Sequence, residues 1–234
     1  MDLSSAHVLV TGGSTGIGRA TARLLADRGA RVAICGRNEQ KLAAAAAETG
    51  AVAIPADVSR EEDVVRLVER AIQELGGYDV LVNNAGLGTF VPLLEVTADE
   101  MRRVWETNVL GATLVARESA RHFVAQRRGN IVNVASTAGQ RAGAGGSAYA
   151  STKFALSGLT QSWRAELRKH DVRVMQVNPS EVITDFFASA GVEQPEDPTK
   201  LHPEDIAHVI LGMLELHDRG FVTEATVWAT NPRS

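Results

Sequence analysis

Seven short apolar segments recur along the chain, and stretches with apolar residues at helical spacing separate them. The short segments are rich in Val, Ile and Ala and show little alternation with polar residues, which is typical of strands covered on both faces. Because strand-like and helix-like segments alternate, the pattern predicts a doubly wound α/β fold: a seven-stranded parallel sheet with helices on both faces. The expected strands are residues 7–12, 30–36, 51–58, 78–86, 130–136, 172–179 and 225–230.

Two helix starts carry a recognisable N-terminal signal. Residues 59–75 contain one apolar stripe at helical spacing, made of Val64, Leu67, Val68, Ala71, Ile72 and Leu75. Ser59 with Glu62, and Thr97 with Glu100, have the spacing of a capping box, in which each side chain accepts a hydrogen bond from the other residue's backbone N–H. The sequence therefore predicts that Ser59 and Thr97 cap helices.

The chain has 234 residues and shows no linker and no repeat beyond the strand–helix alternation, so we expect one domain over residues 1–234. Two irregular regions follow strands: residues 137–147 are rich in Gly and Ala, and residues 185–201 contain two prolines and a Phe pair. Ligands bind beyond the carboxyl ends of the strands in such a sheet. Both regions are therefore expected to border the binding site, the second as a substrate loop or lid.

Composition narrows the class of protein further. The net charge is −4 and no stripe of Lys and Arg is present, so a nucleic-acid partner is not expected. The lone Cys35 cannot form a disulfide within the chain, and its apolar surroundings predict a buried side chain. No signal peptide, membrane span or metal-ligand cluster is recognisable, so we expect a cytoplasmic protein with no membrane partner.

The segment TGGSTGIG, residues 11–18, lies between the first strand and the first helix. Gly12, Gly16 and Gly18 would let the backbone approach a ligand closely, and the helix that follows presents unpaired N–H groups. An ordinary glycine turn would look similar. The position in the first crossover of a doubly wound sheet favours a pyrophosphate, and hence a dinucleotide cofactor.

Arg37 follows the second strand, where a site for NAD usually carries an acidic residue that binds the ribose 2′-hydroxyl. A carboxylate would repel a 2′-phosphate, whereas a guanidinium can bind one through paired, charged hydrogen bonds. The sequence therefore predicts NADP (NADPH) as the cofactor. The alternative is that Arg37 is a solvated loop charge.

Four polar residues are candidates for chemistry. Tyr149 and Lys153 are four residues apart in a helical stretch, so they share one face, and an ammonium beside a phenol favours the phenolate. Ser136 ends the fifth strand, and Asn108 lies inside a helical stretch although Asn is a poor helix former. Taken singly, each has an ordinary alternative as a surface pair, a local cap or a surface polar group.

Together these features resemble the short-chain dehydrogenase/reductase family, in particular the compact bacterial type typified by 3-oxoacyl-acyl-carrier-protein reductases. The resemblance covers nearly the whole chain and rests on landmarks in the family's order and spacing: residues 11–18, Asp57-Val58, residues 83–86 (NNAG), Asn108, Ser136, Tyr149, Lys153 and Asn178-Pro179. It implies a Rossmann-type domain and an NADP(H)-dependent oxidoreductase that interconverts a carbonyl and an alcohol.

The resemblance also implies a role for each matching residue. Tyr149 would be the general acid/base, Lys153 would lower its pKa and hold the nicotinamide ribose, and Ser136 would polarise the substrate carbonyl. Asn108 would anchor a water in a proton relay. The residues implied to bind the cofactor, with Arg37 from the argument above, are Gly12, Ser14, Thr15, Gly16, Ile17, Gly18, Arg37, Asp57, Val58, Asn84, Ala85, Gly86, Tyr149, Lys153, Pro179, Val182 and Thr184.

Three differences from the family pattern are visible. Ser180 and Glu181 follow Pro179 where the family usually has Gly, which places a side chain and then a carboxylate in the turn near the nicotinamide. Thr15 stands where many NADP-preferring members carry a basic residue, so the NADP preference rests on Arg37. The C-terminus lacks the family's glycine-rich tail, which puts contacts of a tetramer built on that tail in doubt.

Substrate and partners are less defined. Phe186 and Phe187 would form either an apolar lid or part of the core, and Arg127, Arg128 and Arg141 are candidates for contact with an acyl-carrier protein. The expected long helices at residues 99–126 and 149–169 resemble the pair through which the family forms a homodimer or homotetramer. Two other functions stay open: a non-catalytic dinucleotide sensor on the same fold, and an NAD-dependent alcohol dehydrogenase.

Overall fold

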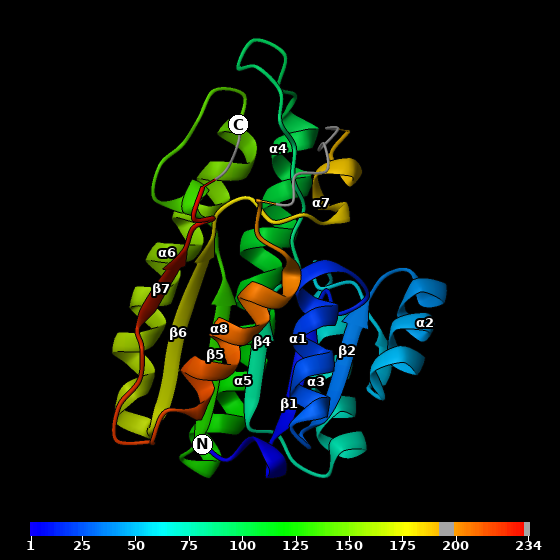
Figure 1. Ribbon diagram of the computed structural model, residues 1–234, viewed down its shortest axis with the longest axis vertical. Helices are drawn as coiled ribbons and strands as arrows, with labels where there is room; N and C mark the ends of the chain where they lie inside the picture. Colours follow the sequence, from blue (N-terminus) through cyan, green and yellow to red (C-terminus); the bar gives the residue numbers. More distant parts are fainter. Residues whose placement is uncertain (192–198, 232–234) are drawn as a thin grey trace.

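In the computed structural model, which describes residues 1–191 and 199–231, seven parallel strands form one sheet in the order β3-β2-β1-β4-β5-β6-β7 (Figure 1). The expected seven-stranded parallel sheet is confirmed. The strands are β1 (His7–Thr11), β2 (Arg31–Gly36), β3 (Val52–Pro55), β4 (Val80–Asn83), β5 (Gly129–Val134), β6 (Val172–Pro179) and β7 (Glu224–Val227).

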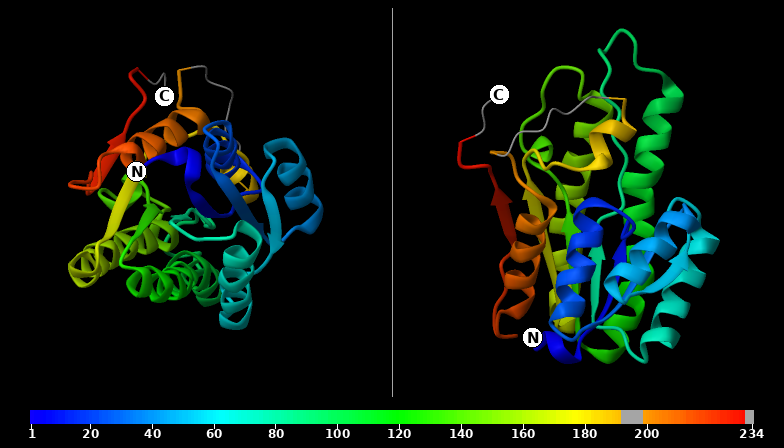
Figure 2. Two further views of the ribbon diagram at one scale, coloured as in Figure 1. Left: turned by 90° about the horizontal axis from the view of Figure 1, so that it is seen from below. Right: turned by 45° about the vertical axis from the view of Figure 1, so that its right-hand side comes forward.

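Helices cover both faces of the sheet, as expected (Figure 2). Helices α1, α2 and α8 pack on one face, and α3, α5 and α6 pack on the other. The helices are α1 (Gly16–Asp27), α2 (Glu39–Thr49), α3 (Glu61–Leu75), α4 (Ala98–Trp105), α5 (Ala112–Gln126), α6 (Ser147–Leu167), α7 (Asp185–Ser189) and α8 (Pro203–Glu215). Within the described residues, no helix is long and apolar enough to cross a membrane.

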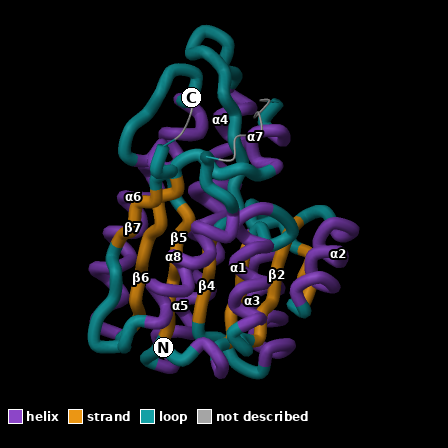
Figure 3. The backbone as a smooth tube through the Cα atoms, viewed as in Figure 1, coloured by secondary structure: helices purple, strands orange, loops and turns teal. Residues whose placement is uncertain are grey.

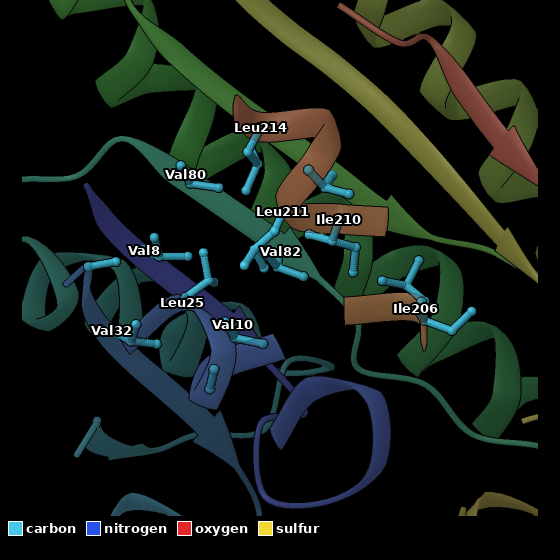
Figure 4. Packing of buried hydrophobic residues seen from close by; sticks show 14 of the residues in the cluster. Val8, Val10, Leu25, Val32, Val80, Val82, Ile206, Ile210, Leu211 and Leu214 are labelled. Carbon is cyan, nitrogen blue, oxygen red and sulfur yellow. The ribbon is translucent and has the colours of Figure 1, made fainter. Parts of the chain in front are cut away.

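The period of two along each strand divides the core into two apolar layers. Val8 and Val10 of β1 point into the layer under α1 and α8, shown in Figure 4, whereas Leu9 between them joins the layer under α3 and α5. All three side chains are fully buried. Strands with apolar residues on both faces therefore produce a sheet sandwiched between helices, as their sequence indicates.

The direction in which successive strands are added to the sheet reverses between β3 and β4. From β1 the chain continues to β2 and β3 on one side, and then returns to β4 on the other side of β1 (Figure 3). In an open parallel sheet the loops diverge at such a point and leave a crevice beyond the carboxyl ends of the strands. This topology places the segments after β1, β4, β5 and β6 around one crevice.

One of the two predicted capping boxes is confirmed. Thr97 accepts a hydrogen bond from the Glu100 N–H, and the Glu100 carboxylate accepts one from the Thr97 N–H at 2.8 Å. The prediction at Ser59 is wrong, because α3 begins at Glu61 with Arg60 as its N-cap. The Ser59 hydroxyl instead donates to the Asp57 carboxylate at 2.7 Å, in the turn that precedes α3.

The expected helix at residues 99–126 is present as one continuous helical run from Ala98 to Gln126. Within it a π-helical segment, Glu106–Gly111, joins α4 to α5 and contains Asn108. The other expected long helix, at residues 149–169, begins earlier as α6 at Ser147 and ends in a 3-10 turn at Arg168–His170. A π-helical turn inserts one extra residue into a helix and often occurs at functional sites.

Candidate functional site

A pocket of about 950 Å³ lies at the carboxyl ends of the strands, the upper edge of the sheet in Figure 1. Both irregular regions border it, through Thr137, Ala138 and Arg141 on one side and residues 185–187 on the other. This confirms the expected location of these two regions. Residues 192–198 of the predicted lid lie outside the described residues.

The glycine segment after β1 forms one wall of the pocket. Gly12 and Gly16 have positive φ angles of 64° and 51°, which only glycine adopts without strain. A Cβ on Gly12 would lie 2.9 Å from the Cα of Ala85, so the chain could not follow this path with a larger residue. Thr15, the N-cap of α1, provides no side-chain cap, and the first turn of α1 contains no acidic residue. The backbone N–H groups at the start of α1 therefore remain available for an anion at the pocket.

Gly18, predicted to bind the cofactor, does not line the pocket. It lies in the first turn of α1, where a Cβ would come within 2.3 Å of the carbonyl oxygen of Gly12. The absent side chain lets α1 pack directly against the glycine segment. Gly18 therefore shapes the wall of the pocket without forming part of its surface.

The segment after β4 is fastened to the same wall. The Thr11 hydroxyl accepts hydrogen bonds from the N–H groups of Asn84 at 2.9 Å and Ala85 at 3.0 Å. The Asn84 amide donates in return to the carbonyl oxygen of Thr11 at 3.0 Å. These bonds hold two predicted cofactor-binding residues at a fixed distance from the glycine segment.

The far end of the pocket, beyond β2, carries two cations. Arg37 and Lys41 both line it, together with Ser14 and Asn38. Arg37 is exposed and forms no hydrogen bond or ion pair with another residue that the structure describes. Asp57, in contrast, is occupied, because its carboxylate accepts bonds from the Ser59 N–H and hydroxyl at 3.0 and 2.7 Å.

Tyr149, Lys153 and Ser136 meet at the opposite end. Lys153 is buried, and its ammonium donates to the carbonyl oxygen of Val134 at 2.9 Å while lying 5.6 Å from the centre of the Tyr149 ring. The Ser136 hydroxyl donates to the Pro179 carbonyl at 3.4 Å and accepts from the Ala138 N–H at 3.1 Å. All three side chains line the pocket, so residues that are separate in the sequence form one polar cluster in the structure.

The pKa of Tyr149 departs from the sequence-based expectation. We expected Lys153 to lower it, but burial raises the pKa of Tyr149 to about 12, against a smaller lowering by the hydrogen-bonding Ser136 hydroxyl. Burial also lowers the pKa of the Lys153 ammonium to about 8. Both shifts have the same cause, since removal from water penalises the charged form of either group.

Asn108 has structural hydrogen bonds of its own, and its role in a proton relay stays a prediction. Its side chain is buried and does not line the pocket. The amide donates to the Leu87 carbonyl at 2.9 Å and to the Thr152 hydroxyl at 3.0 Å, and its oxygen accepts from the Leu87 N–H at 2.7 Å. Asn108 thus fastens the segment after β4 to the π-helical turn and to α6, the helix that carries Tyr149.

The unusual residues after Pro179 are built into the wall of the pocket. The Ser180 N–H donates to the Val227 carbonyl at 2.9 Å, and Glu181 forms an ion pair with Lys200 at 2.7 Å. Val182 pairs with Leu201 in an isolated β-bridge. The Glu181 carboxylate therefore has a partner of opposite charge and is not an unpaired charge beside the proposed nicotinamide site.

Thr184 connects this segment to the glycine wall. Its hydroxyl caps α7 by accepting from the Phe186 N–H at 3.3 Å, and its methyl group would lie 3.1 Å from a Cβ on Gly16. The segment after β6 therefore reaches across the crevice to the segment after β1. Pro179, Val182 and Thr184 all line the pocket, in the place that the sequence predicted.

Several residues at the pocket carried no clear signal in the sequence. Phe90 and Phe186 contact the Tyr149 ring and Phe187 stacks on Phe90, and only the Phe pair was considered as a lid. Phe90 follows β4 in a loop without a motif, so only the fold shows that it reaches Tyr149. The other pocket residues that were not predicted include Cys35, Gly36, Asn38, Lys41, Ala56, Leu87, Thr107, Val134, Ala135, Ser180, Glu181 and Asp185. The expected burial of Cys35 is confirmed, and burial raises the pKa of its thiol to about 12.

The residues around the pocket fit a dinucleotide. An uncapped helix start with glycines at positive φ suits a pyrophosphate, and cations lie at one end of the pocket while a phenol, an ammonium and a hydroxyl lie at the other. The volume of about 950 Å³ accommodates a large cofactor together with a small substrate.

Two bacterial relatives are similar over most of this chain. The sequence is 36% identical to the uncharacterized oxidoreductase YxnA of Bacillus subtilis, over 87% of this chain and 61% of YxnA. It is 33% identical to the uncharacterized oxidoreductase SAR2567 of Staphylococcus aureus, over 96% of this chain and 97% of that protein. The chain thus spans less than two thirds of YxnA but nearly all of SAR2567.

Solved structures share both the fold and part of the sequence. A metagenomic short-chain oxidoreductase in complex with NADP superposes with a TM-score of 0.85 and 33% identity, over 98% of this chain and 99% of that one. The 3-ketoacyl-(acyl-carrier-protein) reductase of Brucella melitensis complexed with NADH superposes with a TM-score of 0.90 and 30% identity, over 96% of this chain and 97% of that one. The short chain dehydrogenase profile matches residues 6–195. The chain therefore belongs to the short chain dehydrogenase family, whose members are oxidoreductases that bind a nicotinamide dinucleotide.

Proposed function

We propose that this protein is an NADP(H)-dependent reductase that converts a carbonyl compound to an alcohol, with Tyr149 as the proton donor. The observation that carries the proposal is the convergence of the Tyr149 phenol and the Ser136 hydroxyl, beside the Lys153 ammonium, at one end of a pocket that fits a dinucleotide. A pure dinucleotide sensor has no evident need for all three groups.

When bound, the reduced dinucleotide supplies the hydride that adds to the carbonyl carbon and is itself oxidised. The protein must then deliver a proton to the carbonyl oxygen and stabilise the charge that develops there. Burial keeps the pKa of Tyr149 at about 12, so at neutral pH the phenol holds the proton that reduction requires. In the reverse reaction, alcohol oxidation, Tyr149 would act as the base and would have to give up this proton first.

Ser136 and Lys153 support this step from two sides. The Ser136 hydroxyl is positioned to donate a hydrogen bond to a carbonyl oxygen beside the Tyr149 phenol. Lys153 is positioned to hold a ribose hydroxyl and places a positive charge near the phenol. Asn108 is a positioning residue, because its three hydrogen bonds fasten Leu87 and Thr152 and leave it outside the pocket.

The preference for NADP rests on Arg37 and Lys41. Both cations line the adenosine end of the pocket, and Gly36 stands where an acidic residue would repel a 2′-phosphate. One related structure contains NADP and another contains NADH, so the family membership alone leaves this preference open. The other predicted cofactor-binding residues that line the pocket are proposed to make the remaining contacts with the dinucleotide.

The test is consumption of NADPH, followed by absorbance, with a panel of carbonyl compounds for the wild type and for Tyr149→Phe. Removal of a general acid is expected to lower kcat about 100-fold or more, because proton transfer by a positioned side chain contributes about 10²- to 10⁴-fold. NADP binding, measured by fluorescence titration, should change little, since the ring remains.

The chain offers a matched control, because it contains two tyrosines. Tyr78 is buried at the amino edge of the sheet, and its hydroxyl is hydrogen-bonded to Ser119 at 2.7 Å. Tyr78→Phe removes the same atom and should leave turnover unchanged. Equal activity of Tyr149→Phe and the wild type would refute the assigned role, and tight NADPH binding without turnover of any carbonyl would favour the sensor.

A further inference from the structure

We propose that the substrate is an aryl carbonyl compound, that is, a ketone or aldehyde whose carbonyl group is attached to a flat aromatic ring. This inference rests on the proposed function, since it names the substrate class of the same site. Its basis is a group of three phenylalanine rings at one end of the pocket, called the aromatic slot below: Phe90 and Phe186 contact Tyr149, and Phe187 stacks on Phe90.

The rings come from two segments that are far apart in sequence. Phe90 lies after β4, and Phe186 and Phe187 lie in α7 after β6. The centroids of Phe90 and Phe186 are 5.4 and 5.3 Å from that of Tyr149, and Phe187 is stacked on Phe90 at 5.6 Å with an angle of 23°. These separations are in the range that favours aromatic contacts, so the slot offers ring faces and edges directly beside the proposed proton donor.

A glycine specifies this arrangement. A Cβ on Gly88 would lie 2.9 Å from the ring atoms of both Phe90 and Phe186. Any side chain at position 88 would therefore displace at least one of the two rings. The close approach of the rings is thus built into the backbone of the segment after β4.

The rings are not simply core residues. All three are half-buried and line the pocket, whereas the side chains of the two apolar layers under the helices are largely closed to solvent. They therefore present apolar surface to whatever occupies the substrate end. A flat aromatic ring would replace water at these ring faces and edges and make aromatic contacts that a puckered aliphatic ring cannot make.

The alternative substrate, an acyl thioester on an acyl-carrier protein, fits the surface less well. Arg127 pairs with Asp171 at 3.0 Å, and Arg128 pairs with Asp79, both just before β5 at the amino edge of the sheet. Of the three arginines considered for such a partner, only Arg141 lines the pocket. These three arginines therefore do not form one basic surface at the pocket for an acidic carrier protein.

The experiment compares two ketones that differ in one ring. Acetophenone and cyclohexyl methyl ketone carry the same acetyl group, on a flat aromatic ring and on a puckered saturated ring. Because conjugation also changes the intrinsic reactivity of the carbonyl, the decisive quantity is the ratio of their kcat/KM values in each variant. Loss of one ring contact in Phe187→Leu or Phe90→Leu should lower this ratio by up to about tenfold.

Phe221→Leu is the matched control. Phe221 lies before β7, at the amino edge of the sheet, and is partly buried against the core. The ratio should not change in this variant. An unchanged ratio in both Phe187→Leu and Phe90→Leu would overturn the aromatic slot, as would a higher kcat/KM for a sugar or a 3-oxoacyl thioester than for acetophenone.

Binding separates this inference from the proposed reaction. Saturation-transfer NMR of both ketones, on the wild-type protein with NADP⁺, measures occupancy without turnover. Stronger binding of acetophenone that is lost in Phe187→Leu would support the slot even if NADPH were never consumed. Equal binding of the two ketones to the wild type would overturn the slot even if the reductase activity were real.

Discussion

Burial sets the protonation of both members of the Tyr149–Lys153 pair. Each side chain lies in a site that disfavours its charged form, so the phenol keeps its proton and the pKa of the ammonium falls to about 8. The carbonyl of Val134 is the hydrogen-bond acceptor of Lys153. The cost of burying this cation reduces the stability of the fold wherever Lys153 is charged, so the site is maintained at the expense of stability.

This cost predicts a dependence of stability on pH. The pKa of Lys153 falls from the 10.5 of an ordinary lysine, which applies to the unfolded chain, to about 8 in the folded protein, so between these values the unfolded chain binds more protons. The cost of burying the charged Lys153 is therefore absent above pH 10.5, where the group is neutral in both states. As the pH falls through 8 the full cost appears, and the free energy of unfolding is lower by that amount. Relative to Lys153→Met, the wild type should gain up to roughly 3 kcal/mol over this window, at about 1.4 kcal/mol per pKa unit.

Urea unfolding from pH 7.5 to 10.5 measures this difference. Lys169→Met, which removes an exposed ammonium, is the control and should follow the wild type at every pH. A constant difference between the wild type and Lys153→Met over the window would contradict the lowered pKa.

At the scale of elements, the pocket depends on how closely α1 packs on the glycine segment. The absent Cβ of Gly18 leaves the carbonyl oxygen of Gly12 in direct contact with the helix. Because this contact involves backbone on both sides, neither partner can rotate away as a flexible side chain would.

Gly18→Ala should therefore move α1 away from the glycine segment. Overpacking of this kind costs about 1–3 kcal/mol, and the displaced wall should also weaken dinucleotide binding. Gly212→Ala is the matched control: Gly212 lies in α8 with no atom within 4 Å of a Cβ, so the change should stabilise the fold by about 0.5–1 kcal/mol. Urea unfolding and a fluorescence titration with NADP⁺ measure both effects, and unaltered NADP⁺ binding by Gly18→Ala would refute the packing argument.

The elements that the sequence predicted are those whose signal is local. Apolar strands and the glycine segment depend on residues close in sequence, and they form where expected. The cap at Ser59 was wrong because Ser59 lies in a turn closed by its two hydrogen bonds to the Asp57 carboxylate, and α3 begins only at Glu61. The π-helical turn was not predicted, and the partners of Asn108 in that turn, Leu87 and Thr152, are distant in sequence.

At the scale of the whole molecule, the proposed cofactor would contact parts of the chain that are far apart in sequence. The pocket walls come from segments after β1, β2, β3, β4, β5 and β6, and from α6. The position of each segment follows from the strand order, which the alternation of strands and helices predicted. The choice of cofactor does not follow from the topology, and it depends on side chains at the end of β2.

The last prediction concerns how far each dinucleotide stabilises the fold. A ligand that binds only the folded protein adds about 2.7 kcal/mol at a hundredfold excess over Kd, which in a chain of this size corresponds to a rise of about 5–10 °C in Tm. NADP⁺ at that concentration should produce this rise, and NAD⁺ at equal concentration a much smaller one, because Arg37 lines the adenosine end without a protein partner among the described residues. Arg37→Ala should remove most of the difference between the two dinucleotides. Arg23→Ala, which removes an exposed guanidinium paired with Glu48 outside the pocket, should preserve it. Equal rises in Tm with NADP⁺ and NAD⁺ in the wild type would mean that the 2′-phosphate gains nothing from Arg37, and the NAD-dependent alternative would then describe this protein better.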